Sequence, residues 1–493
     1  MRKSVIALIA VVVLAGAAAA AVPVIERHAA AGIKSEIERG GTAKVDEVSV
    51  SLLGRRVTLV NLKSKGAMEE VSIGRWQASG LAWPIGELLA GRTPLTGFHW
   101  GDPLSADRVE LENMAMADRA SGGRWNTDVL LIEGFDLARY DANYDGTFRF
   151  TVLIARAMGA LSVRRLEQRN TRVTLPGSGE TVGLGSVVVE GYERGLIAKL
   201  AMDGMDVASG EGQPAQFSIA ETKATKVDLG RTIAAMSSDQ WFPGAPSGRV
   251  QIETAKATGF GGELFKRYGI SLGEVSFQTA QVGDKVSRTR TRIDGFVLAP
   301  PLRGLGGLSL RMTLQSMGLK EVKADFDCHG TEDQDKGELT LDRCALVSPG
   351  LGEIELSARI VNADAIFWNA LDESDLLALQ DSTAALGAAR LVLTDKSLLE
   401  RGLRAFATLT GQPVATLRAN WAHEVRRFQP AGVLISQSMT HLLDTAARFV
   451  EQGGTLVVEA RPEPPVGFDR LEYLLNPGAD LVSTLGLKAT LLK

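Results

Sequence analysis

The sequence predicts a mainly β protein with added helices, in the α+β class. The expected parts are an N-terminal membrane helix, an elongated, curved antiparallel sheet of repeated strands with helical inserts, and a helix-rich C-terminal part. Three observations support this class. A spaced apolar pattern recurs along the chain, an apolar run occupies residues 5–25, and the pattern becomes helical after residue 362.

The recurring pattern is apolar, any, apolar, then two skipped residues, then apolar, any, apolar. Alternation with period two predicts a half-buried strand. A change of phase within the run predicts a bulge or tight turn that re-aims the side chains. The copies are Val109/Leu111/Met114/Met116, Leu200/Met202/Met205/Val207, Met312/Leu314/Met317/Leu319 and Leu339/Leu341/Cys344/Leu346, with looser copies at Val57/Leu59/Leu62 and Ile293/Phe296/Leu298.

Composition narrows the class of protein. A chain of 493 residues with 45% hydrophobic and 23% charged residues can bury a large core. It can form two to four ordinary domains or, in a repetitive β architecture, one elongated body. Lys and Arg total 54 against 58 for Asp and Glu, a formal charge of -4, which argues against a nucleic-acid partner. Two cysteines exclude a disulfide-dense scaffold and a four-cysteine zinc site.

The N-terminal segment indicates export. Arg2 and Lys3 precede an apolar run over residues 5–25 that only Pro23 interrupts. A cleaved signal peptide would use the small residues at 17–21, giving a soluble periplasmic protein. We favour a retained inner-membrane anchor, because the run approaches the ~20 residues needed to span a bilayer and an amphipathic segment follows it directly. The two basic residues keep the N-terminus cytoplasmic, so the rest of the chain is expected in the periplasm.

The expected elements follow in order along the first part of the chain. A helix over residues 24–39 ends at Gly40 and Gly41, and strands begin at residue 45. A short helix is expected at 81–90. Strands are expected at 109–116, 129–137 and 147–152, then a helix at 153–168. Strands with one helix at 229–236 fill residues 181–261, and strands with glycine-containing turns fill 273–361.

Helices dominate the expectation after residue 362. They are placed at 363–389, 397–409, 415–426 and 433–451, followed by a strand at 455–459 and a last strand at 487–492. The predicted domains are therefore residues 1–25 (anchor or signal segment), 26–361 (repetitive sheet) and 362–493 (helix-rich region with closing strands). The helices alternatively cap the open end of the sheet, because stacked architectures need terminal covers.

The segment after the apolar run resembles a known family. Residues 45–64 give a strand and then a glycine-led strand with the order Val57-x-Leu59-x-Asn61-Leu62, and residues 109–114 repeat this unit. With the preceding apolar and amphipathic helices, this resembles the start of AsmA-like envelope proteins and is similar to the entry motif of bridge-like lipid-transfer proteins. The resemblance implies an anchored, periplasm-facing sheet with an apolar interior, and a role in phospholipid movement or outer-membrane assembly.

Residues able to carry chemistry form no convincing constellation. None of the histidines pairs at metal-ligand spacing, and His423-Glu424 lacks a second ligand because position 427 is arginine. The glycine-rich segment at 176–185 contains no lysine and suits a hairpin turn rather than a phosphate loop. The acidic cluster at 332–338 is interpreted as a solvated turn. The sequence therefore predicts no catalytic residue, metal site or cofactor.

Cys328 and Cys344 are expected to form a disulfide. They are equidistant from Lys336, so a hairpin centred there places them opposite each other on neighbouring strands. Their phase matches that of Phe326 and Leu346, which points both to the apolar side. Export permits the bond. The alternative is a pair of buried thiols that pack as small hydrophobic groups.

Two sets of residues are candidates for lipid contacts. Arg288, Arg290 and Arg292 share one face of an expected strand and are candidates for anionic head groups, although the sequence favours a solvated outer sheet face. Soft methionine side chains suit acyl chains of varied length, but an ordinary core needs the same residues. The candidate groove lining is Met114, Met116, Met202, Met205, Met312, Leu314, Met317 and Leu319.

Three classes of function remain open. The first is a non-enzymatic protein that handles phospholipid or supports envelope assembly, with acyl chains and other envelope proteins as partners and residues 5–25 in the inner membrane. The second is an envelope scaffold whose sheet is a closed core and which binds partners through its helices or a sheet edge. The third is an exported hydrolase, which the sequence favours least because no site residues stand out.

Overall fold

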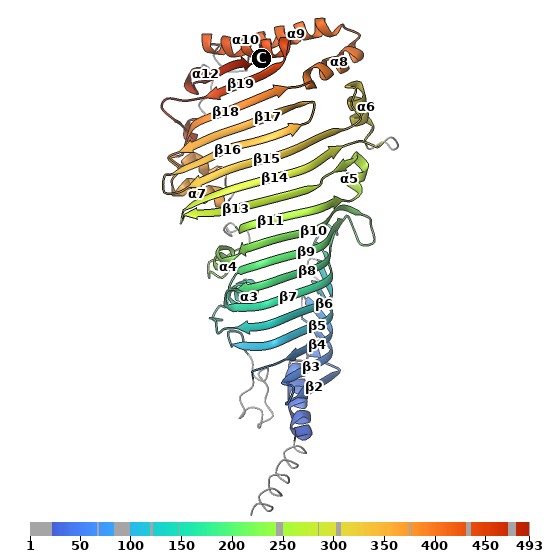
Figure 1. Cartoon of the computed structure of the whole chain (residues 1–493). Coiled ribbons are helices and arrows are strands. Elements are labelled where there is room, and N and C mark those ends of the chain that lie inside the picture. The colour runs from blue at the N-terminus through green and yellow to red at the C-terminus, as the bar shows by residue number, and fades with distance from the viewer. Residues whose placement is uncertain are drawn as a thin grey trace, which may run out of the picture. The chain divides into compact units, whose positions relative to one another are not determined.

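The computed structural model describes residues 22–66, 69–82, 99–118, 122–146, 148–242, 250–283, 285–301, 307–373, 375, 377–429, 435–471 and 480–492. The chain divides into two compact units, Met1–Gln251 and Ile252–Lys493, called here the first and second unit. Each is mainly antiparallel β-sheet with helices added (Figure 1), which confirms the coarse fold class. Expectations for residues 1–21, and for a helix at 83–90, lie outside the described residues.

The first unit is an antiparallel meander in which each strand pairs with the next along the chain. The short β1 (Ala43–Lys44) also pairs with β3. Its helices are residues 22–38, α3 (Arg149–Ala160) and α4 (Gly230–Met236). The sheet strands are β2 (Glu47–Ser51), β3 (Arg56–Lys65), β4 (Glu69–Ser79), β5 (Leu104–Asp118), β6 (Arg124–Leu137), β7 (Leu161–Thr174), β8 (Thr181–Glu193), β9 (Leu196–Ala208) and β10 (Ala215–Asp228).

The second unit has the same kind of sheet. Its paired order is β11 (Gln251–Gly261), β13 (Glu274–Gly283), β14 (Val286–Leu298), β15 (Val322–Asp333), β16 (Glu338–Ser348), β17 (Gly352–Val361), β18 (Ala385–Asp395), β19 (Gly454–Ala460) and β21 (Lys488–Leu492). Two short strands add to it: β12 (Ile270–Ser271) pairs with β14, and β20 (Val466–Gly467) pairs with β18.

The helices of the second unit are α5 (Glu263–Tyr268), α6 (Leu308–Ser316), α7 (Ala365–Glu373), the 3-10 helix η1 (Ala378–Asp381), α8 (Leu398–Thr410), α9 (Val414–Arg427), α10 (Gln437–Gln452), α11 (Phe468–Leu471) and α12 (Leu481–Thr484). The helices α5–α8 lie at the ends of its strands, and α9 and α10 lie beyond β19 (Figure 1). These last two helices pack side by side, and α10 also contacts β19 and β21. This agrees with the expectation that C-terminal helices cover the end of a sheet.

The change of phase in the apolar pattern is a bend in the strand. Asn61, Asn113 and Asn170 have φ angles of 52°, 53° and 50°, and Gly204 has 68°. Each lies at a step that the strand register skips; Val60 pairs with Arg75 and Leu62 with Ile73, while Asn61 is passed over. Asparagine and glycine tolerate this left-handed conformation best. The bend lets Leu59 and Leu62 stay on one face although they are an odd number of positions, three, apart.

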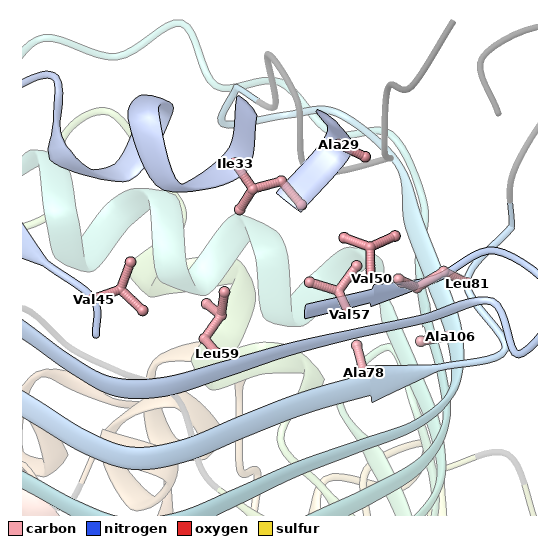
Figure 2. Close-up of a cluster of buried hydrophobic side chains, with 9 residues drawn as sticks. All are labelled: Ala29, Ile33, Val45, Val50, Val57, Leu59, Ala78, Leu81 and Ala106. Atoms are coloured by element: carbon pink, nitrogen blue, oxygen red, sulfur yellow. The ribbon is translucent and has the colours of Figure 1, made fainter. Parts of the chain in front are cut away.

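The amphipathic helix at residues 22–38 closes one end of the first unit. Its Ala29 and Ile33 are buried against the ends of β2 and β4 and the starts of β3 and β5 (Figure 2). Full burial of a valine, leucine or isoleucine side chain contributes about 1.5–3 kcal/mol, so this cluster holds the helix on the sheet. The other members of the cluster are Val45, Val50, Val57, Leu59, Ala78, Leu81 and Ala106.

The expectations between residues 147 and 168 are only partly met. Residues 149–160 form helix α3, so the strand expected at 147–152 is wrong, whereas the helix expected at 153–168 is confirmed as far as residue 160. Residues 161–174 form strand β7 instead of continuing that helix. The arginine and glutamate residues of β7 favour helices in isolation, but the segment pairs along its whole length with β6 and β8. Tertiary pairing outweighs intrinsic propensity here.

Two further expectations fail in the second unit. The alanine-rich half of residues 363–389 is not helical, because β18 starts at Ala385 and pairs with β17 and β19. The copy of the apolar pattern at 312–319 is not a strand, because α6 covers Leu308–Ser316. Leu310, Leu314 and Met317 recur at helical spacing, which competes with the alternation of Met312 and Leu314. The helices near 397–409, 415–426 and 433–451 are confirmed as α8, α9 and α10.

Membrane spanning is not observed among the described residues, in which no helix is long and apolar enough to cross a bilayer. The expected anchor at 5–25 falls mostly on residues outside that part of the chain.

Candidate apolar binding site

Strand register in the second unit builds a continuous apolar row across the sheet. Because side chains alternate between faces, residues that are register partners share a face. The row begins at Val275 on β13 and ends at Leu491 on β21. Its members, each paired with the next, are Val275, Ile293, Phe326, Leu346, Ile354, Leu393, Leu456 and Leu491.

The opposite face of the same strands carries ion pairs. Arg290 bonds Asp327 through two nitrogens, at 3.0 and 2.7 Å. Arg343 reaches Glu353 at 2.9 Å and Glu355 at 2.8 Å. Opposite charges on neighbouring strands stabilise the sheet and keep this face solvated. One face is therefore apolar and the other charged.

A cavity of about 700 Å³ lies over part of the apolar row. Ile293, Phe326, Leu346, Ile354 and Leu393 form its floor, on five neighbouring strands. The other lining residues come from the ends of β14–β18, from the turns, and from α8 and α10: Phe296, Met317, Leu319, Val322, Ala324, Ser348, Leu351, Gly352, Glu353, Thr394, Asp395, Leu398, Leu399 and Phe449.

The cavity is open to solvent, whereas the end of the sheet beside it is closed. Leu346, Ile354 and Leu398 keep 44%, 46% and 49% of their surface exposed, although all three are large apolar side chains. Leu456, which continues the row on β19, is only 6% exposed, and α10 packs against that strand. Large apolar side chains left exposed together typically mark a binding surface. The sheet therefore offers an apolar site over β14–β18 and a sealed core beyond it.

Arg401 holds the wall of this cavity in place. Its guanidinium donates to the carbonyl oxygens of Met317 and Gly318, at 3.2 and 3.3 Å, and to Ser397 Oγ at 3.0 Å. These bonds join the C-terminal end of α6 to the start of α8. Met317, at the end of α6, and Leu398, at the start of α8, both line the cavity.

The first unit has an apolar face of the same kind. Register partners run from Leu59 on β3 to Met202 on β9, and from Leu62 on β3 to Met205 on β9. A cavity of about 340 Å³ lies between the helix at 22–38 and this face. It is lined by Ile33, Glu36, Ile37, Leu59, Leu62, Ile73, Trp76 and Leu111.

Buried polar side chains interrupt this face at its centre. Thr127 and Thr171 are register partners in the row of Leu62 and Met205, and both are buried. Their hydroxyls hydrogen-bond to each other, and Gln168 Nε2 donates to Thr127 Oγ1 at 2.9 Å. Mutual bonding satisfies these groups and removes most of the cost of burial. Sequence reasoning missed the cluster because isolated threonines in strands give no distinctive signal.

The predicted lining residues divide between two environments. Met114, Met116, Met202 and Met205 lie on the apolar face of the first unit, by their register partners. Met317 and Leu319 line the larger cavity of the second unit. Met312 and Leu314 do not line it: Leu314 is buried, and Met312 is 60% exposed on α6. Helical geometry separates these two side chains, which a strand would have placed together.

The predicted arginines lie away from the apolar row. Arg288, Arg290 and Arg292 alternate with Thr289, Thr291 and Ile293, so they share the charged face. Arg290 is bonded to Asp327, and Arg292 to Asp294 at 3.0 Å. These contacts favour the interpretation of a solvated outer face, as the sequence does.

The two cysteines are joined. Cys328 and Cys344 are register partners on β15 and β16 and form a disulfide, as the hairpin arithmetic predicted. The bond lies in the row of inward positions next to Phe326 and Leu346, beside the cavity floor.

On the charged face near the cavity, Asp327 has a clearly shifted pKa. Two hydrogen bonds from Arg290 lower the pKa of Asp327 from 3.8 to about 2, against the opposing effect of burial, and His329 adds to the lowering. No basic residue is found among the described residues that line the cavity. Within the same described part of the chain, no group of three or more His, Cys, Asp or Glu residues could hold a metal ion.

Comparison with known proteins gives limited information. A family model described only as "Uncharacterized protein" matches residues 345–491, which include β17–β21 and α7–α12 of the second unit. No curated protein matches the chain.

Proposed function

We propose that this protein is a non-enzymatic, inner-membrane-anchored periplasmic protein that binds phospholipid acyl chains on its apolar sheet faces and so supports the cell envelope. The observation that carries the proposal is the open cavity of about 700 Å³ over β14–β18. Its floor is a row of large aliphatic and aromatic side chains supplied by five successive strands.

The chemistry of such a site is burial rather than reaction. Each methylene removed from water contributes about 0.8 kcal/mol, so a chain lying along the row gains affinity from its length. Mostly apolar pockets of ~300–1,000 Å³ are usual for small-molecule ligands. The resemblance of residues 45–64 to AsmA-like proteins, and the apolar run at 5–25, supply the proposed location and anchor.

The test is native mass spectrometry with lipid extraction of the full chain, purified in a mild detergent. The test variant is Leu346→Gln with Ile354→Gln, which places amides on the cavity floor. The matched control is Val347→Gln, the next residue of β16, whose side chain points to the charged face. We expect co-purified lipid in the wild type and control, and at least a tenfold loss in the double variant.

A folded wild-type protein that carries no lipid would contradict the proposal. It would favour the scaffold class instead, in which the sealed core around Leu456 and the C-terminal helices serve partner binding. Retention of wild-type lipid by the double variant would exclude this cavity as the binding site.

A further inference from the structure

The length of the larger cavity matches one acyl chain. The floor crosses β14–β18, which are four inter-strand spacings of ~4.8 Å, so it is about 19 Å long. A single leaflet of the bilayer hydrocarbon core is half of ~30 Å, or about 15 Å, which is the depth that one acyl chain occupies. A chain lying along Ile293, Phe326, Leu346, Ile354 and Leu393 is therefore covered for its whole length.

The width of the cavity admits one chain and leaves little room for a second. On β14 the inward lining positions are Ile293 and Phe296, and on β16 they are Leu346 and Ser348. Residues two apart on a strand are about 7 Å apart, so on these strands the floor is a trough between two rows. On β15 a third inward position, Val322, also lines the cavity at one edge of the trough. The next row contains the disulfide Cys328–Cys344, which does not line the cavity. Over most of its length the floor therefore covers one chain.

Charge gives the cavity no means to hold a head group. The described lining residues include two carboxylates, Glu353 and Asp395, and no basic side chain. Glu353 is engaged by Arg343 at 2.9 Å on the charged face. Asp395 Oδ1 accepts the backbone N–H of Leu399 at 2.9 Å, at the start of α8. Both acids are committed to the fold, so a polar head group would remain outside in water.

We propose that the ligand of this cavity is a monoacyl lipid, a fatty acid or a lysophospholipid, selected by chain length and not by head group. The inference rests on the proposed function and narrows it to one class of ligand. Binding strength follows the methylenes that the trough covers. It stops rising once the chain is longer than the trough.

The test is calorimetric titration of the full chain, held in an amphipathic polymer without detergent. The probes are saturated fatty acids from laurate to stearate, lysophosphatidylcholines with the same chains, and short-chain diacyl phosphatidylcholine. Leu346→Trp fills the trough, and Val347→Trp adds the same bulk to the charged face. Thermal unfolding of each variant shows whether it is folded. The first unit has its own apolar face, which can also bind lipid. Only the binding that is lost in the Leu346→Trp variant is therefore assigned to the cavity over β14–β18.

We expect about fourfold tighter binding for each added methylene, followed by a plateau. Palmitate and its lysophosphatidylcholine counterpart should compete for one site with affinities within threefold of each other. Leu346→Trp should weaken the longest chains at least tenfold, and Val347→Trp should not.

A tenfold dependence on head group, or tighter binding of the diacyl lipid than of monoacyl lipids with the same chains, would overturn this inference while leaving acyl-chain binding intact. An absence of any saturable binding sensitive to Leu346→Trp would overturn the proposed function as well.

Discussion

At the scale of single residues, Asp327 is the clearest case of a side chain whose charge depends on the fold. Its carboxylate accepts two hydrogen bonds from Arg290 and lies 3.2 Å from His329 Nε2. The folded-state pKa is lowered to about 2, below the value of 3.8 expected for an unperturbed aspartate. Such a group stabilises the folded state above pH ~4, and this contribution disappears as the pH falls towards ~2.

Replacement of Asp327 by asparagine should therefore destabilise the protein in a pH-dependent way. We expect a loss of about 1 kcal/mol near neutral pH, a modest value because solvent reaches the pair. The difference from wild type should shrink towards zero near pH ~2. Urea unfolding at several pH values measures it, with Asp335→Asn, whose side chain is 64% exposed, as the control. A difference that does not change with pH would refute the assignment.

The disulfide provides a second residue-scale prediction. Cys328 and Cys344 lie 16 positions apart, and closing a loop of this size stabilises a protein by about 3 kcal/mol in the chain-entropy model. Thiol titration of the denatured protein should find no free thiols before reduction and two afterwards. Replacing both cysteines by serine should lower the free energy of unfolding by about that amount. Two free thiols in protein isolated from an oxidising compartment would show that the bond does not form.

At the scale of elements, the bends in the strands depend on residues that accept a left-handed backbone. Asn170 on β7 has a φ of 50°, and its amide donates to Asp128 Oδ2 on β6 at 2.9 Å. Asn170→Val should cost about 2 kcal/mol, because a β-branched residue disfavours this conformation and the hydrogen bond is lost. Asn170→Gly should cost less than about 1 kcal/mol, since only the bond is lost. Equal losses in urea unfolding would mean that backbone strain is not the cause.

The junction between α6 and α8 gives an element-scale prediction about the site. Arg401→Gln removes the bonds to the carbonyl oxygens of Met317 and Gly318. Amide hydrogen exchange over residues 308–319 should become faster, and acyl-chain affinity should fall several-fold because the cavity wall loosens. Arg404→Gln, one turn later on α8, is the matched control, because among the described contacts its guanidinium bonds only Glu400. Unchanged exchange in the Arg401 variant would show that other contacts hold the wall.

Helices and strands whose apolar residues follow a single period, either that of a helix or that of a strand, could be predicted from the sequence. The strands around Val109 and Leu200 alternate without a competing helical pattern, and α8–α10 carry apolar residues at helical spacing. Prediction failed where two periods coexist, as at Met312 in α6. It also failed where residues that favour helices are held by neighbours on both sides, as in β7 and β18. Pairing partners are long-range information that local pattern does not contain.

At the scale of the whole molecule, the candidate site was only partly foreseeable. Met317 and Leu319 were predicted as lining, and Leu346, Ile293 and Phe296 occurred in copies of the apolar pattern. Leu398 and Phe449 were not singled out, because they belong to α8 and α10 and reach the cavity only through the packing of those helices beside β18. Where it predicted a strand, the sequence pattern identified the apolar face but not which part of that face remains exposed.

The N-terminal run at 5–25 makes the final prediction, about the location of the chain. If it is a retained anchor, the intact mass of the protein isolated from membranes should include residue 1, apart from removal of the initiating methionine. The protein should also stay with membranes after washing at alkaline pH, whereas a chain starting at residue 26 should not. The helix at 22–38 would then emerge directly from the bilayer, with its Ile33 packed on β2–β5 and against the smaller cavity. A mature N-terminus near residues 17–22 would instead establish a cleaved signal peptide and a soluble periplasmic protein.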